Sequence, residues 1–179
     1  MGNLLAPKAT FRTRVQVQDT DEVKYDWKDV TTEQIFTNKR VVLFSLPGAF
    51  TPTCTTFQLP NFDAKYGEFK ALGIDEVYCA SVNDSFVMNA WFRQLQIQNV
   101  KSIPDGNGDF TRKMGFLVEK KPNGFGERSW RYAIIVNNGV IENIFEEDGF
   151  EDNVPVTEDP YVQTTPDVLL SYLKTERSA

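Results

Sequence analysis

The chain has 179 residues, 41% of them apolar and 25% charged, which predicts one soluble globular domain spanning residues 1–179. Its formal net charge of −6 repels phosphate backbones, and no run approaches the roughly 18 apolar residues of a membrane helix, so neither nucleic-acid binding nor membrane insertion is expected. The chain contains no His and only two Cys, which excludes Ser-His and Cys-His catalytic pairs and a disulfide-stapled scaffold. The start, MGNLLAPKATFRTR, lacks the basic and apolar pattern of a signal peptide, so we expect a cytoplasmic protein.

The first part of the chain predicts two strands separated by a short helix. Residues 10–18 alternate apolar and polar side chains, as in an exposed strand or one arm of a hairpin. Residues 31–36 (TTEQIF) are typical of a capped helical turn. The continuous apolar run 40–46 (RVVLFSL) predicts a central strand that is buried on both faces.

A helix is expected shortly after this strand. From Cys54 to about Leu72, apolar residues recur near helical spacing, and Gly73 is a typical helix stop. Pro60 is expected to kink this helix near its first turns, because proline removes one backbone N–H and its ring meets the preceding turn.

The rest of the chain alternates strands with helices and then turns back on itself. Parallel strands alternating with helices, together with an antiparallel hairpin, predict an α/β fold with a mixed central sheet covered by helices on both faces. The thioredoxin-like architecture has this element order. We expect a strand at 76–82 and then a helix that is capped by Asn83 or Asp84 and runs to about Gln98. A strand at 100–103, a turn at 104–108 and helical turns at 109–115 should follow. The last elements are strands at 130–136 and 140–146 around the turn Asn137-Asn138-Gly139, an acidic loop at 146–160, and a helix opened by Thr165-Pro166-Asp167.

The most informative stretch is PGAFTPTC, residues 47–54, which leaves the buried strand and enters the helix. A thiol at Cys54 meets the unpaired N–H groups and the positive end of the helix dipole, and both favour the thiolate. A larger thiolate fraction gives only a small gain in rate, since nucleophilicity falls as basicity falls. Fast chemistry therefore requires donors that stabilise the departing oxygen: backbone N–H groups, the Thr51 hydroxyl and an Arg from a neighbouring strand.

These residues carry a family resemblance. PGAFTPTC resembles the Pro-x-x-x-Thr-x-x-Cys signature of peroxiredoxins, and most closely that of the type II, or atypical, subfamily. The resemblance continues through SVNDSFVMNAW (81–91), PDGNGDFTRKMG (104–115) and RSWRYAIIVNNG (128–139), and covers roughly residues 8–175.

The resemblance implies a thioredoxin-like fold and a thiol-dependent peroxidase that reduces hydrogen peroxide and small alkyl hydroperoxides. Cys54 would be the peroxidatic cysteine, which attacks a peroxide oxygen and becomes a sulfenic acid. Thr51 would hydrogen-bond the thiolate and the peroxide, Pro47 would shield the thiolate, and Arg131 would stabilise the transition state. Backbone N–H groups near Thr53 and Cys54 would hold the substrate. Type II members commonly form homodimers, and no metal or other cofactor is implied.

The chain departs from the subfamily pattern at two places. Many members have His four residues after the cysteine, where this chain has Gln58, so any pH effect of that His should be lost. No cysteine lies in residues 147–165, where some members carry a resolving cysteine. Cys79 is either a structural cysteine or a resolving one. We favour a one-cysteine cycle in which glutathione with glutaredoxin, or thioredoxin, reduces Cys54.

Other interpretations stay open at this point. A lone Cys after Thr-Pro-Thr can be a buried packing residue, and the protein could be a peroxide relay or a thioredoxin-like binding module instead of a peroxidase. Arg128 is expected at an interface or in a solvated loop, and the acidic run 146–152 in solvent. Phe50, Phe86 and Trp91 are expected in the core or at a dimer contact. The turn PDGNGD resembles a calcium loop but lacks the Glu that such a loop needs.

Overall fold

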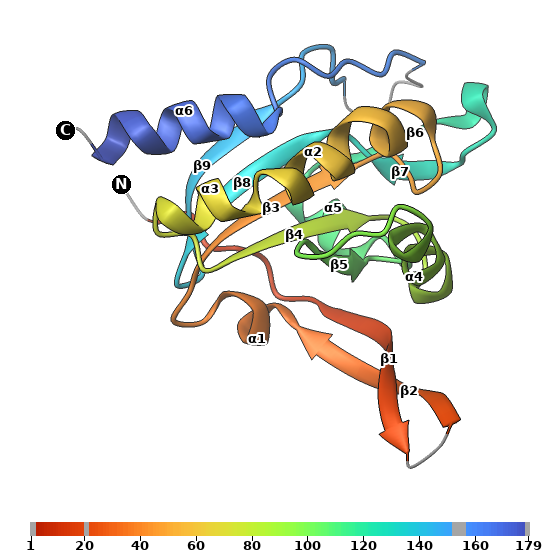
Figure 1. Ribbon diagram of the computed structural model, residues 1–179. Helices are drawn as coiled ribbons and strands as arrows, with labels where there is room; N and C mark the ends of the chain where they lie inside the picture. Colours follow the sequence, from red (N-terminus) through yellow and green to blue (C-terminus); the bar gives the residue numbers. More distant parts are fainter. Residues whose placement is uncertain (1–2, 20–21, 152–156, 178–179) are drawn as a thin grey trace.

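The central feature of the computed structural model is a five-stranded mixed sheet in the order β5-β4-β3-β8-β9 (Figure 1). The structure describes residues 3–19, 22–151 and 157–177. The predicted run forms the middle strand β3, Arg40–Leu46, whose last six residues are all buried. Strand β3 pairs in parallel with β4, Glu76–Ser81, and antiparallel with β8, Tyr132–Asn137. The outer strands are β5, Lys101–Pro104, and β9, Val140–Glu146.

Helices cover both faces of this sheet, which confirms the expected thioredoxin-like α/β fold. One apolar cluster joins Phe44 of β3 to side chains of α2 (Leu59–Ala64), α3 (Tyr66–Ala71), α4 (Ser85–Gln94) and α6 (Pro166–Arg177). Phe62 stacks on Phe44 with 3.9 Å between ring centroids. The other face packs on α1 (Thr32–Phe36), α5 (Asp109–Met114) and the segment that leads to Trp130. Cys54 and Cys79 both belong to the first cluster.

Two small antiparallel pairs lie outside the main sheet, and the sequence predicted neither in full. Residues 10–18 do form a strand, within β1 (Thr10–Asp19), but it pairs with an unpredicted partner β2 (Glu22–Thr31) in a hairpin that projects from the body (Figure 1). Strand β2 is exposed along its first eight residues, but Val23, Tyr25 and Trp27 alternate with polar residues there, so its sequence does carry the pattern of a strand. The three-residue strands β6 (Leu117–Glu119) and β7 (Glu127–Ser129), joined through a 3₁₀ turn at Lys121–Asn123, are too short for a periodic pattern.

The helix expected from Cys54 to Leu72 is three consecutive pieces. It opens with one π-helical turn, η1 (Cys54–Gln58), in which the Leu59 N–H donates to the Cys54 carbonyl oxygen five residues back. Pro60 follows directly. In a regular α-helix the proline ring would clash with a backbone carbonyl of the preceding turn, and proline has no N–H to donate to that carbonyl. The wider π-helical turn leaves room for the ring. A second break falls at Lys65, and Gly73 ends the run in the left-handed region with φ of +87°, as predicted.

Three further boundaries differ from the expectations. Asp84, and not Asn83, caps α4, because its carboxylate accepts the Val87 N–H. The same helix ends at Gln94 and not at Gln98, because Gln96 has a positive φ of +54° and turns the chain away from the helix. The strand expected from residue 130 begins at Tyr132, so Arg131 lies just before it.

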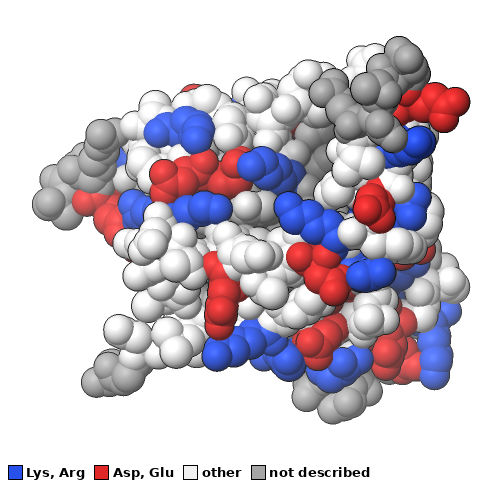
Figure 2. Space-filling model, turned by 90° about the horizontal axis from the view of Figure 1, so that it is seen from below, with Lys and Arg blue, Asp and Glu red and all other residues white. Residues whose placement is uncertain are grey.

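Charges of both signs lie close together on one face of the molecule. On the face seen from below, Lys and Arg are interspersed with Asp and Glu, without a broad area of one sign (Figure 2). Such a face lacks the basic stripe that tracks a phosphate backbone. Among the described helices, none combines the length and the apolar character needed to span a bilayer.

Candidate active site

Cys54 is the first residue of the π-helical turn η1, which follows the central strand β3 after a short loop. The loop begins with three buried residues, Pro47, Gly48 and Ala49. The next residue, Phe50, has its backbone in the left-handed region, with φ of +65°. A side chain other than glycine in that region costs on the order of 1–3 kcal/mol, and such strain clusters at functional sites. The Ala49 N–H donates to the side-chain oxygen of Asn83 at 3.0 Å, which ties the loop to the end of β4.

The Cys54 sulfur is held by the Arg131 guanidinium. Arg131 Nη2 lies 3.2 Å from Cys54 Sγ, although the two residues are 77 positions apart. Both side chains are buried, with 0% exposure for Cys54 and 1% for Arg131. A buried guanidinium in contact with sulfur places a positive charge and N–H donors directly at that atom, away from water.

Each of the three guanidinium nitrogen atoms of Arg131 has a polar partner. Nε donates to Gln58 Oε1 at 2.8 Å, and Nη1 donates to the Pro160 carbonyl at 2.6 Å and to the Asp159 carbonyl at 3.4 Å. Besides Cys54, Nη2 contacts Asp159 Oδ1 at 2.8 Å in an ion pair. An Arg side chain has five N–H donors, so this guanidinium is held in one orientation.

A segment from the late chain covers Arg131; we call residues 157–165 the strap. Lys120, 1% exposed, donates from Nζ to the Glu158 carbonyl at 2.9 Å. Burial lowers the pKa of the Lys120 ammonium group. Glu147, also 1% exposed, accepts the backbone N–H groups of residues 162–164 and the Thr164 hydroxyl. The expectation that the acidic run lies in solvent is therefore wrong for Glu147, whose carboxylate anchors the strap.

The loop residues predicted for the site lie beside Cys54, but Thr51 does not make the predicted contact with sulfur in this structure. Its hydroxyl donates to the Gly48 carbonyl at 2.7 Å. The oxygen of that hydroxyl keeps its acceptor capacity for a substrate O–H. Thr53 and Cys54 stand at the start of the helix, where no preceding turn supplies acceptors for their N–H groups.

Arg128 supports the loop from below, a role that the sequence did not indicate. Its Nη1 donates to the Pro47 carbonyl at 3.0 Å and its Nε to the Phe125 carbonyl at 3.1 Å. A Cβ on Gly48 would overlap Arg128 Nη1, so only glycine allows this close approach. In the sequence, Gly48 directly after Pro47 was the one sign that another group approaches the loop closely at this point.

Cys79 lies apart from this donor network. It stands in β4 opposite Phe44 of β3 and is fully buried. Burial raises the pKa of its thiol well above the usual value, so Cys79 stays protonated. Both cysteines are free in this structure.

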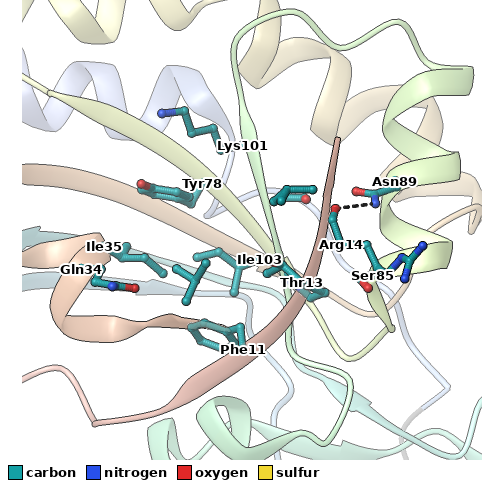
Figure 3. Close-up of a pocket in the computed structure, with 14 residues that line it drawn as sticks. Phe11, Thr13, Arg14, Gln34, Ile35, Tyr78, Ser85, Asn89, Lys101 and Ile103 are labelled. Atoms are coloured by element: carbon teal, nitrogen blue, oxygen red, sulfur yellow. Dashed lines mark hydrogen bonds between the residues drawn. The ribbon is translucent and has the colours of Figure 1, made fainter. Parts of the chain in front are cut away.

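A separate apolar cavity of 360 Å³ lies between β1, α1, α4 and β5 (Figure 3). Phe11, Ile35 and Ile103 line it, and Asn89 donates to the Arg14 carbonyl at its edge. These apolar side chains belong to the cluster on the face of the sheet opposite Cys54. The cavity therefore contributes nothing to the surroundings of the sulfur.

Comparisons with known proteins agree with this geometry. Residues 4–160 match the Redoxin family. The chain is 57% identical to a peroxiredoxin of Rhizobium etli over 94% of its own length and 93% of that protein. It is 48% identical to the hybrid peroxiredoxin hyPrx5 of Haemophilus influenzae, over 93% of this chain and 64% of that protein.

This chain is a peroxiredoxin of the type II kind. A solved structure of a 1-Cys peroxiredoxin, the Plasmodium falciparum antioxidant protein, matches this peroxiredoxin with a TM-score of 0.89 at 36% identity, over 97% of this chain and 99% of that one. The chain is accordingly a thiol-dependent peroxidase.

The contact between Gly48 and Arg128 predicts coupled effects on stability. Gly48→Ala should lower the free energy of unfolding by about 1–3 kcal/mol, because the new methyl group displaces the Arg128 guanidinium. In an Arg128→Ala background the same change should cost less than about 1 kcal/mol, since the obstacle is gone. Urea unfolding of the four proteins measures the cycle. Additive costs would show that the two residues do not meet.

Proposed function

We propose that this peroxiredoxin reduces hydrogen peroxide and small alkyl hydroperoxides through a sulfenic acid at Cys54. The observation that carries the proposal is the 3.2 Å contact between Arg131 and Cys54 Sγ at the start of a helix. In the reaction, the thiolate sulfur forms a bond to the terminal peroxide oxygen as the O–O bond breaks. Sulfur loses two electrons, the departing oxygen leaves as hydroxide or alkoxide, and that anion takes a proton from solvent.

Each loop residue has a role in this scheme. Thr51, whose hydroxyl proton is donated to Gly48, accepts the O–H of the incoming peroxide. The N–H groups of Thr53 and Cys54 donate to its oxygens. Pro47, buried and fixed through its carbonyl to Arg128, shields the thiolate from water.

The cycle that the geometry favours uses one cysteine. A disulfide between Cys54 and Cys79 would require a buried, protonated thiol to leave its strand and the first helical turn to open. The related Plasmodium falciparum protein is itself described as a 1-Cys peroxiredoxin. Glutathione with glutaredoxin, or thioredoxin, would then return Cys54 to the thiolate. A reducing compartment such as the cytoplasm supplies these thiols.

Mass spectrometry after one equivalent of hydrogen peroxide tests this cycle. We expect the parent and Cys79→Ser proteins to gain one oxygen on the peptide that contains Cys54, and Cys54→Ser to gain none. Cys79→Ser should keep most of its turnover with glutaredoxin, because Cys79 takes no part. A disulfide between positions 54 and 79, with turnover lost in Cys79→Ser, would contradict the one-cysteine cycle. An active Cys54→Ser protein would overturn the proposed function itself.

We also propose a homodimer that forms next to the active-site loop. Phe50 and Phe86 are 46% and 58% exposed. The hydrogen bond between Ala49 and Asn83 ties the loop that carries Phe50 to the segment just before α4, which carries Phe86. Phe57, from the π-helical turn, is 56% exposed. Large exposed aromatic side chains of this kind are enriched in protein interfaces.

Sedimentation velocity tests the homodimer. The parent should sediment as a dimer, and Phe86→Arg should shift it to monomer, because a charge in an apolar interface is costly to desolvate. Leu4→Arg, at a site 56% exposed, is the matched control and should stay dimeric. A parent that is monomeric at every concentration, or a dimeric Phe86→Arg, would contradict the proposal.

A further inference from the structure

Each nitrogen atom of the Arg131 guanidinium already has a polar partner before any oxygen arrives at the sulfur. These partners are Gln58 Oε1, Cys54 Sγ and oxygen atoms of the strap. A peroxide oxygen placed at Cys54 Sγ would compete with these acceptors for the Arg131 hydrogens. A buried donor without a partner would meet that oxygen at no such cost.

Gln58 carries such a donor. Its Oε1 accepts the Arg131 Nε–H at 2.8 Å, and since Arg can only donate, this contact fixes which end of the amide is oxygen. The other end, Nε2, is buried and has no hydrogen-bond partner among the described residues, while the residue as a whole is 0% exposed. An unpaired buried donor destabilises the fold, so its retention calls for an explanation.

The position of this donor supplies the explanation. Gln58 follows Cys54 by four residues within the same π-helical turn, a spacing that puts both side chains on one side of the helix. The same guanidinium holds Gln58 Oε1 through Nε and Cys54 Sγ through Nη2. The amide group of Gln58 therefore lies on the same side of the helix as the sulfur, on the same guanidinium, and its Nε2 is left without a partner among the described residues.

We propose that Gln58 is a catalytic residue whose Nε2–H donates to the oxygen atom transferred to Cys54. This inference rests on the proposed function. As the S–O bond forms and the O–O bond breaks, two electrons leave sulfur and the distal oxygen departs as hydroxide or alkoxide. The transferred oxygen stays on sulfur as the sulfenic acid and accepts the hydrogen bond from Gln58. One good hydrogen bond made in the transition state contributes about 0.5–1.5 kcal/mol, which corresponds to roughly a three- to tenfold gain in rate.

The test compares a reagent that delivers oxygen with one that does not. Gln58→Met keeps the length of the side chain and removes both the Nε2 donor and the acceptor that Arg131 uses. Its rate constant for oxidation by hydrogen peroxide should fall about three- to tenfold beyond any fall in the rate of alkylation by iodoacetamide. The additional loss should be the same factor for hydrogen peroxide and cumene hydroperoxide, because the transferred oxygen is common to both. Release of Arg131 from its proper place would instead slow alkylation and oxidation together.

A second variant keeps the inference falsifiable if Gln58→Met is unstable. Gln58→His offers one ring nitrogen that accepts from Arg131 and one that donates, so it should restore most of the oxidation rate. Equal losses for peroxide and iodoacetamide in Gln58→Met, or a Gln58→His protein as slow as Gln58→Met, would overturn the role of Gln58. Either result would leave the peroxidase assignment intact, since that assignment depends on the Cys54→Ser protein.

Discussion

The contact between Arg131 and the Cys54 sulfur is the interaction on which the rest of the site depends. The structure brings a cation to a buried sulfur and then fixes that cation with further bonds to Gln58, Asp159 and Pro160. A buried guanidinium without acceptors would be costly, because its lost contacts with water would not be replaced. The oxygen atoms around Arg131 replace those contacts, so the cation can stay buried beside the sulfur, away from water.

The two segments that flank Arg131 are held by side chains that never touch the sulfur. Lys120 and Glu147 hold the strap through its backbone, and Arg128 holds the loop through the Pro47 carbonyl. Asp159 completes the arrangement, because its carboxylate balances the Arg131 charge and limits how that side chain can turn. Residues distant in the chain thus act together as a rigid support, which is what preorganised stabilisation of a developing charge requires.

The sequence predicted the sheet, the position of Cys54 at a helix start and the approach of Arg131 well, because each depends on a local pattern or on a long motif. It did not indicate Asp159, Lys120 or Glu147. Their contacts join segments that are separated along the chain, and an acidic residue in a Glu- and Asp-rich stretch looks solvated until its partners are known. The π-helical turn was within reach, since Pro60 already predicted a disturbance of that turn. The exposed strand β2 was also within reach, since Val23, Tyr25 and Trp27 alternate with polar residues.

The most direct test of this account is the rate at which hydrogen peroxide oxidises Cys54 in the Arg131→Lys protein. Stopped-flow tryptophan fluorescence can follow the reaction, since Trp91 donates to the Thr55 hydroxyl next to Cys54. Lysine keeps the charge but lacks the planar set of five donors, so the network cannot form and the rate constant should fall by about 100-fold or more. A rate constant within about threefold of the parent value would show that charge alone suffices, and it would contradict the central role of the fixed guanidinium.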